Sequence, residues 1–349
     1  MKRFAGGLLM AALLTGGVAA DEQATWFMPA PRERSASAEA LWEAAAGEPL
    51  VKRLLAAGWK REPGAEVLRR DGIRLVVERS SAVAEGEREV NLGDTTARLD
   101  TREGRMAFPY LGFQLRAEPK GAIESLASEL AGDRGLTETL GESVKGRAIV
   151  AHRLGEGDET VIFFGAFHGD EPESTELCEK LLEHLREHPE LIADRSVIIV
   201  PAVNPDGLDA DSRLNANGVD LNRNFPTSNW SSEGKGGDYW GGTAASSEPE
   251  TKVVVELLGR FKPDRIISIH CPYKCVNYDG PAEKLAAIMA EENGYEVKPS
   301  IGYPTPGSFG TYAGIEGEIP TITLELPPTG EEDVWTDNRD ALVRALRGK

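Results

Sequence analysis

The sequence predicts an α/β fold in which helices cover both faces of a sheet. From about residue 121 onward, short β-branched and apolar runs alternate with amphipathic helical segments. This alternation is typical of strands in a mostly parallel sheet that are connected by helices packed against it. The chain has 349 residues, 40% of them hydrophobic, which is enough for such a domain with a substantial core.

The expected elements follow one another along this region. We predict strands at 148–153, 161–167, 197–203, 265–270 and 321–326, and helices at 173–188, 248–261, 282–293 and 337–346. The strands are nearly continuous apolar runs, as in a sheet that is buried on both faces. Ligands of such sheets bind at the carboxyl ends of the strands, so polar residues at those ends are candidates for a functional site.

Residues 21–120 differ from the rest of the chain. They are rich in Ala, Glu and Arg and contain no recognisable site, but they include a helical pattern at 38–57 and strand-like runs at 73–78 and 108–116. We predict an N-terminal accessory domain of unknown role over 21–120 and a catalytic domain over 121–349.

The first 20 residues carry a secretory signal pattern. Lys2 and Arg3 precede an uncharged apolar run, and Val18 and Ala20 are small residues at the expected cleavage site. The run is short for a membrane span, although an uncleaved anchor is an alternative. We therefore predict a signal peptide over 1–20, a periplasmic location and no membrane insertion of the mature chain.

Charge and cysteine content exclude several classes of function. The chain has 39 Lys and Arg residues against 57 Asp and Glu, a net charge of −18, which disfavours nucleic acid and anionic membranes as partners. Cys271 and Cys275 could close a small loop, with Cys178 left as a buried thiol on a helix. Nothing in the sequence indicates an oligomeric state.

Two histidines and a glutamate lie at the ends of predicted strands. The strand at 161–167 runs into His168 and, three residues later, Glu171, and the strand at 265–270 ends in His270. Two imidazoles and a carboxylate are the ligand set of an open catalytic zinc site, with water in the fourth position. Such an ion lowers the pKa of its water to about 7 and polarises a carbonyl group. A His-x-x-Glu sequence alone is equally compatible with an ordinary polar loop.

Other motifs make the pattern more specific. Asn204-Pro205-Asp206-Gly207 follows a predicted strand, and residues 215–226 read NANGVDLNRNFP. Glu325 stands in the otherwise apolar run TITLELP, where burial of a carboxylate costs free energy unless it is paired, bound or functional. An edge strand or a salt bridge is the alternative explanation for Glu325.

Together these motifs resemble the zinc metallocarboxypeptidase family of the carboxypeptidase A/B type. The resemblance covers roughly residues 121–349, and five separated motifs occur in the order found in the family. It implies a mixed, mostly parallel sheet of the eight-stranded type with helices on both faces. It also implies one Zn²⁺ per chain bound by His168, Glu171 and His270, with Asp220 orienting a zinc-bound histidine.

The resemblance implies further roles around the metal. Glu325 matches the general base that activates water, and Arg213 stands where an arginine stabilises the oxyanion. Asn222 and Arg223 match the pair that binds the terminal carboxylate of the substrate, for which a planar guanidinium is well suited. Tyr303 is the candidate for a mobile tyrosine over the substrate.

Within this family, four blocks resemble the murein peptide amidase A group. They are ANGVDLNRNFPTSNW (216–230), NYDGPA (277–282), GYPTPGSFGTYAG (302–314) and TITLELP (321–327). The resemblance implies a murein-derived peptide as substrate and hydrolysis of its γ-D-glutamyl–meso-diaminopimelate amide bond. Residues 307–310 would form part of the side-chain pocket, and Gly310 stands where digestive carboxypeptidases carry an acidic residue.

Two other functions remain open from the sequence. One is a broader zinc carboxypeptidase or an N-acyl amino acid deacylase, and the other is a catalytically silent module that binds peptidoglycan peptides. A second zinc-like motif, His184-Leu185-Arg186-Glu187-His188, is interpreted as a solvated helix end because Pro189 follows it at once.

Overall fold

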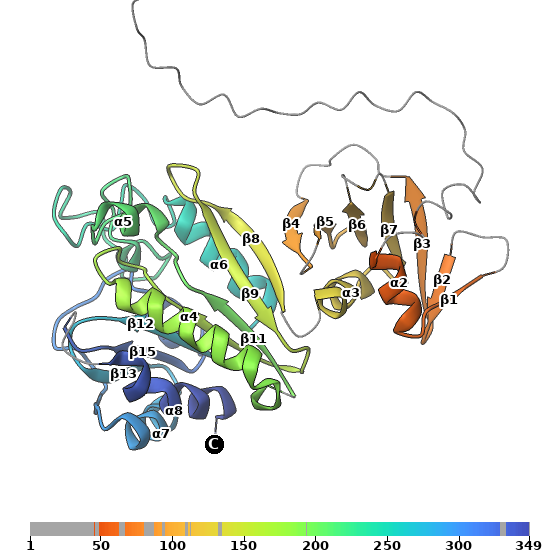
Figure 1. Ribbon diagram of the computed structural model, residues 1–349. Coiled ribbons are helices and arrows are strands. Elements are labelled where there is room, and N and C mark those ends of the chain that lie inside the picture. Colours follow the sequence, from red (N-terminus) through yellow and green to blue (C-terminus); the bar gives the residue numbers. More distant parts are fainter. Residues whose placement is uncertain are drawn as a thin grey trace, which may run out of the picture. The chain divides into compact units, whose positions relative to one another are not determined.

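The computed structural model describes residues 45, 49–62, 67–79, 87–92, 95–108, 111, 113–131, 135–192, 194–328 and 333–348. The described strands form one hydrogen-bonded sheet in the order β1-β2-β3-β7-β6-β5-β4-β8-β9-β11-β10-β12-β15-β13-β14 (Figure 1). The predicted signal peptide over 1–20 lies outside the described residues.

The described strands after residue 135 form the part of the sheet that carries the candidate site. They are β8 (Leu136–Glu142), β9 (Ala148–Leu154), β10 (Glu159–Phe164), β11 (Arg195–Val200), β12 (Arg265–His270), β13 (Cys275–Asp279), β14 (Glu296–Lys298) and β15 (Thr321–Glu325). Neighbouring strands run parallel from β11 through β10 and β12 to β15, whereas β8, β9 and β13 add antiparallel pairs. The predicted α/β fold with a mixed sheet is therefore confirmed.

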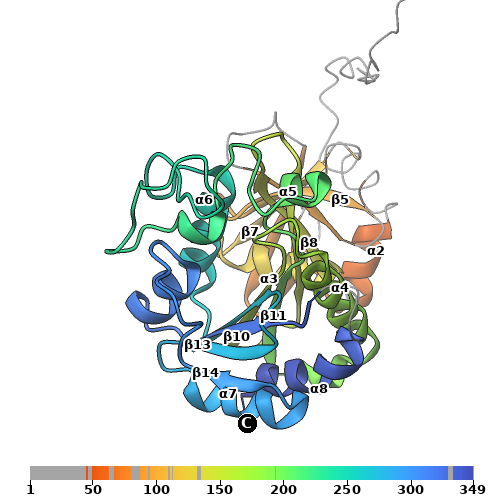
Figure 2. The ribbon, with the colours of Figure 1, turned by 90° about the vertical axis from the view of Figure 1, so that its left-hand side faces the viewer.

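Helices cover both faces of these strands, as expected. α4 (Pro172–Glu187), α7 (Glu283–Asn293) and α8 (Val334–Arg347) share one hydrophobic cluster with Phe163 of β10. α6 (Pro249–Phe261) and the π-helical segment η4 (Gly310–Glu316) share another with its neighbour Phe164. Successive residues of a strand point to opposite faces, so these clusters lie on the two sides of the sheet. In Figure 2, α4 and α8 lie to the right of the strands and α6 to the left.

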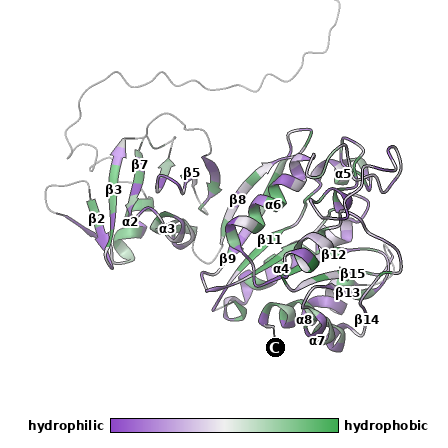
Figure 3. Ribbon diagram, turned by 180° about the vertical axis from the view of Figure 1, so that it is seen from behind, coloured by the Kyte–Doolittle hydropathy of each residue, from purple (hydrophilic) through white to green (hydrophobic). Residues whose placement is uncertain are grey.

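The hydropathy of the helices fits this arrangement. α4 and α6 each carry hydrophobic and hydrophilic residues side by side along their length (Figure 3). In α4 the buried residues include Leu177, Leu181 and Leu185, which recur at the helical period and pack on the sheet. The shorter helical elements are η2 (Pro189–Leu191), α5 (Pro205–Ala210) and η3 (Leu221–Arg223).

The described residues before 135 form an antiparallel segment of the sheet with two helices. Its elements are α2 (Pro49–Ala56), β1 (Lys60–Arg61), β2 (Val67–Arg70), β3 (Ile73–Arg79), β4 (Arg88–Asn91), β5 (Thr96–Asp100), β6 (Arg105–Phe108), β7 (Phe113–Glu118) and α3 (Ala122–Ala131). Apolar residues of both helices and of the strands form one hydrophobic cluster. The accessory and catalytic domains over 21–120 and 121–349 stay a prediction.

Three predictions about strand boundaries were wrong, and one of them is the strand expected at 197–203, because β11 ends at Val200. The run at 108–116 is not one strand, because β6 and β7 form an antiparallel pair in which Phe108 lies opposite Phe113. The PYLG sequence between them contains Pro and Gly, which favour a turn. The strand expected to reach residue 167 ends at Phe164, and Ala166 then adopts a φ of 42°, so His168 lies in a loop.

The sequence left open whether Cys271 and Cys275 close a loop, and it predicted that Cys178 is a buried thiol on a helix. Cys178, Cys271 and Cys275 are buried free thiols, and Cys178 lies on α4. Among the described residues, no helix is both long enough and apolar enough to cross a bilayer.

Candidate active site

Two histidines and one glutamate from separate elements meet near the carboxyl ends of β10 and β12. His168 and Glu171 lie in the loop between β10 and α4, and His270 is the last residue of β12. Nδ1 of His168 lies 2.7 Å from Oε1 of Glu171, and Nδ1 of His270 lies 3.0 Å from Oε2. All three side chains are buried, and their ligand atoms lie within 4.8 Å of one another.

The donor atoms of this cluster fit zinc. Two imidazole nitrogens and one carboxylate are the ligands that catalytic zinc sites use. Burial raises the pKa of Glu171, but His168 and His270 more than offset this effect and hold the pKa below its usual value. The carboxylate is therefore ionised, as a metal ligand must be. These three residues could hold a metal ion.

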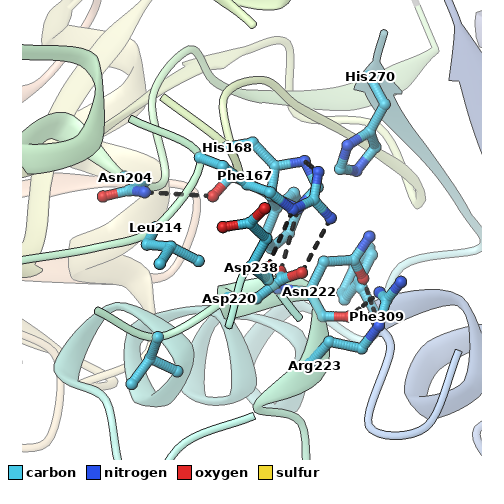
Figure 4. Close-up of polar contacts among 12 residues, drawn as sticks. Phe167, His168, Asn204, Leu214, Asp220, Asn222, Arg223, Asp238, His270 and Phe309 are labelled. Carbon is cyan, nitrogen blue, oxygen red and sulfur yellow. Dashed lines mark hydrogen bonds and ion pairs between the residues drawn. The ribbon is translucent and has the colours of Figure 1, made fainter. Parts of the chain in front are cut away.

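Asp220 lies behind His168 and connects it to Arg213. Oδ1 of Asp220 is 3.1 Å from Nε2 of His168 (Figure 4). Oδ2 of Asp220 accepts a 2.8 Å hydrogen bond from Nη2 of Arg213. A carboxylate bonded to the second nitrogen of a metal-binding histidine orients the ring and fixes its tautomer. Nη1 of Arg213 is itself 3.3 Å from Nδ1 of His168, so this guanidinium reaches the edge of the cluster.

Glu325 ends β15 beside His270. The two residues are paired in the parallel ladder of β12 and β15. Glu325 is only 5% exposed, and its Oε2 atom is buried without a hydrogen-bond partner among the described residues. Burial raises the pKa of Glu325, an effect that His270 partly offsets. A buried carboxylate with an unpartnered oxygen beside this cluster is well placed to take up a proton.

Asn222 and Arg223 follow Asp220 directly in η3. Arg223 is 4% exposed, and its Nη1 donates to the backbone oxygen of Asn222 at 2.6 Å. Among the described residues it forms no ion pair with a carboxylate. Oδ1 of Asn222 accepts a 2.8 Å hydrogen bond from the backbone N–H of Phe309, which leaves its amide NH₂ group as a donor. A buried guanidinium that no carboxylate of the described residues contacts within ion-pair distance is suited to binding an anionic ligand.

These side chains surround one cavity of about 330 Å³. All predicted site residues except Asp220 line it. Tyr303 is 37% exposed in the cavity wall, and its ring lies 6.3 Å from that of Tyr239. Burial and a hydrogen bond with Tyr273 raise the pKa of Tyr303 to about 12, so its hydroxyl keeps its proton near neutral pH.

Tyr239, Tyr273 and Asp279 also lie in the cavity wall and were not predicted from the sequence. The ring of Tyr239 lies 5.0 Å from the guanidinium carbon of Arg213 and 5.5 Å from that of Arg223, within the range of cation–π contacts. Tyr239 stands in a loop without a periodic pattern, so no sequence signal indicated it. Asp279 belongs to the NYDGPA sequence at 277–282, which by itself indicates no role for this side chain.

Comparisons with known proteins agree with this geometry. A family model described as zinc carboxypeptidase matches residues 125–287. Murein peptide amidase A of Escherichia coli (strain K12) is 33% identical in an alignment of 224 positions that covers 60% of this chain and 89% of that protein. The chain belongs to the zinc carboxypeptidase family. It is therefore a zinc metallopeptidase, as the resemblance implied.

Two other relatives support membership of the zinc carboxypeptidase family. Murein peptide amidase A of Vibrio campbellii is 31% identical over 204 residues, covering 55% of this chain and 79% of that protein. The crystal structure of a murein-tripeptide amidase from Escherichia coli O157 superposes with a TM-score of 0.52 at 32% identity. The superposed part covers 60% of this chain and 91% of the chain in that crystal structure. The resemblance to the murein peptide amidase A group is confirmed.

The second zinc-like motif does not form a comparable site in this zinc carboxypeptidase. His184 and His188 lie near the end of α4 with ring centroids 4.5 Å apart, and His188 is 3.2 Å from Glu190. Among the described residues, only His168, Glu171 and His270 form a group that could hold a metal ion. His184 and His188 are partly exposed, in agreement with the predicted solvated helix end.

Proposed function

We propose that this zinc metallopeptidase hydrolyses the γ-D-glutamyl–meso-diaminopimelate amide bond of murein peptides. Relatives named murein peptide amidase A match most of their own length to this chain. The observation that carries the proposal is that Arg223, which is buried and forms no ion pair among the described residues, lines the same cavity as His168, Glu171 and His270. One site then binds an anionic end of a peptide and acts on an amide bond nearby.

Arg223 and Asn222 bind the free carboxylate of the leaving residue. The guanidinium offers parallel N–H donors to both carboxylate oxygens, and the Asn222 amide adds another donor. Tyr239 packs over the guanidinium group of Arg223 and limits its movement. Because the carboxylate is held at this end of the cavity, the scissile amide lies toward Glu325 and the His168–Glu171–His270 cluster.

One zinc ion held by His168, Glu171 and His270 would supply Lewis-acid chemistry at the scissile carbonyl. Glu325 takes a proton from the attacking water, whose oxygen forms a bond to the carbonyl carbon. Arg213 stabilises the negative charge on the carbonyl oxygen. The C–N bond then breaks, and Glu325 passes the proton to the leaving amine. The hydroxyl of Tyr303 keeps its proton near neutral pH, so it can donate a hydrogen bond from the cavity wall to the bound substrate.

The decisive experiment offers the purified protein two kinds of substrate. L-Ala-γ-D-Glu-meso-diaminopimelate is incubated in parallel with ordinary peptides that end in varied residues, and mass spectrometry identifies the products. We expect free diaminopimelate from the first substrate, and loss of the reaction after chelation and its return with zinc. Trimming of the ordinary peptides at similar rates would instead indicate a broad carboxypeptidase. Release of fatty or other acyl groups from N-acyl amino acids alone would indicate a deacylase.

We also propose that the chain acts in the periplasm after removal of residues 1–20. The support is the charged start, the apolar run and the small residues near Ala20. N-terminal sequencing of protein recovered from the periplasmic fraction tests this directly. The expected first residue is Asp21, and an intact Met1 on membrane-bound protein would contradict the proposal.

A further inference from the structure

A single serine ties together the two ends of the 165–171 loop, which carries His168 and Glu171. Ser174 lies in the first turn of α4, and its side chain is completely buried. Its Oγ accepts a 2.8 Å hydrogen bond from the backbone N–H of Ala166 and donates a 2.6 Å hydrogen bond to the backbone oxygen of Glu171. One hydroxyl group therefore connects the backbone before His168 with the backbone at Glu171.

The backbone of Ala166 adopts a conformation that alanine does not favour. Its φ is 42°, in the left-handed region where the Cβ atom of an L-residue crowds the following carbonyl group. A residue other than glycine stays in this region only where the surrounding structure holds it there. Ala166 is buried and lies two residues before His168. Its conformation therefore sets the direction in which the chain approaches His168.

Other hydrogen bonds connect the 165–171 loop to the chain beyond β11. The backbone N–H of Asn204 donates to the backbone oxygen of Ala166 at 2.8 Å. Nδ2 of Asn204 lies 3.4 Å from the backbone oxygen of Phe167 (Figure 4). Asn204 thus binds two carbonyl groups of the loop, whereas the N–H group of Ala166 is bound by Ser174 from the side of α4.

Removal of the Ser174 hydroxyl would act mainly on Ala166. The backbone oxygen of Glu171 also accepts a 3.1 Å hydrogen bond from the backbone N–H of Ser174, so it would keep a partner. The N–H group of Ala166 would lose its bond to Oγ, and a buried polar group that loses its partner is unfavourable. The left-handed conformation of Ala166 would then lose a contact that holds it in place.

The 165–171 loop is also in close backbone contact with α4. A Cβ atom on Gly165 would lie 2.7 Å from the backbone oxygen of Ser174 and 2.5 Å from that of Pro201. Because the backbone has so little room there, a change in the conformation of Ala166 would displace the part of the loop that follows it. That part carries His168.

We propose that Ser174 is a positioning residue for the metal site: its hydroxyl holds Ala166 in the left-handed conformation and so fixes the spacing between His168 and Glu171. Zinc requires nitrogen and oxygen ligands at about 2.0–2.2 Å, so a displaced loop binds it less well. Ser174 does not line the cavity and acts through the backbone. This inference rests on the zinc site of the proposed function, but it does not depend on which amide bond is cut.

The test measures the affinity for zinc by competition with a chromophoric chelator. Ser174→Ala is expected to lower this affinity about 10–100-fold, the usual effect of losing a group that orients metal ligands. Thr175→Val is the matched control, because Oγ1 of Thr175 also donates a hydrogen bond from α4 to a backbone oxygen, that of Pro201. This substitution removes a hydrogen bond of α4 but none of the 165–171 loop, so it should leave the zinc affinity unchanged.

A second substitution tests whether Ser174 acts through Ala166. Glycine adopts a φ of 42° without crowding, so Ala166→Gly should restore most of the zinc affinity that Ser174→Ala loses. If Ser174 only stabilised α4, a glycine in the loop would not compensate for its loss. If Ser174→Ala does not fold, Ser174→Cys replaces it, because a thiol donates and accepts hydrogen bonds only weakly. The same loss and recovery are then expected to a smaller extent.

Three outcomes would overturn the proposal: equal zinc affinities in the native protein and Ser174→Ala, an equal loss in Thr175→Val, or no recovery with Ala166→Gly. His168→Ala, measured alongside, distinguishes these outcomes from a failure of the proposed function. If His168→Ala binds zinc as tightly as the native protein, the proposed zinc site is wrong and the role of Ser174 is wrong with it. If His168→Ala loses zinc while Ser174→Ala does not, the zinc site stands and only the role of Ser174 is refuted.

Discussion

Oδ1 of Asp220 lies 3.1 Å from Nε2 of His168. This contact occupies one ring nitrogen and leaves Nδ1 facing Glu171, 2.7 Å away. A histidine held in this way offers one defined lone pair to a metal ion, and the carboxylate behind it raises its basicity. The same carboxylate accepts a hydrogen bond from Arg213, so the orientations of His168 and of an arginine in the cavity depend on Asp220.

We predict that Asp220→Asn lowers the affinity for zinc about 10–100-fold, the usual effect of removing such a partner of a metal-binding histidine. Competition with a chromophoric chelator measures it. Asp206→Asn is the matched control, because Asp206 is also buried but pairs with Arg147 and does not line the cavity. Equal zinc affinities in the native protein and Asp220→Asn would show that Asp220 does not support the metal site.

The sequence predicted that His168, Glu171 and His270 lie together, but it did not predict the walls of the cavity around them. His168, Glu171 and His270 are indicated by residue types at strand ends, and the ends of parallel strands meet at one edge of a sheet. Asp279 could not be identified in this way, because its place depends on the antiparallel register between β13 and β15. Strand β13 itself was not predicted, since its sequence CVNYD mixes polar and apolar residues. Its pairing with a distant strand outweighs this weak local pattern.

Arg223 should contribute chiefly through the carboxylate of the leaving residue. Arg223→Lys is expected to lower kcat/KM by about 100-fold or more, because a lysine cannot offer the paired donors of a guanidinium. The control is a substrate whose terminal carboxylate is converted to an amide. That substrate should be poor for the native protein and lose little further activity in the variant. Equal losses on both substrates would contradict the assignment.

Glu325→Gln should abolish turnover without harming the fold. Loss of a general base costs about 10²–10⁴-fold in rate. Because burial raises the pKa of Glu325 and Oε2 has no partner among the described residues, a neutral amide breaks no ion pair there. Zinc content and Tm should therefore match the native protein, which separates this variant from a misfolded one. A variant that retained most of its activity would rule out Glu325 as the base.

The packing of η4 on β13 predicts a contrast between two glycine substitutions. A Cβ on Gly314 would lie 2.5–2.9 Å from Cβ, C and O of Asp279, whereas a Cβ on Gly259 in α6 would meet no atom within 4 Å. Gly314→Ala should therefore lower the free energy of unfolding by about 1–3 kcal/mol, as overpacking does. Gly259→Ala should be neutral or stabilising by up to about 1 kcal/mol, because alanine favours a helix. Urea denaturation measures both, and equal effects would contradict the close packing.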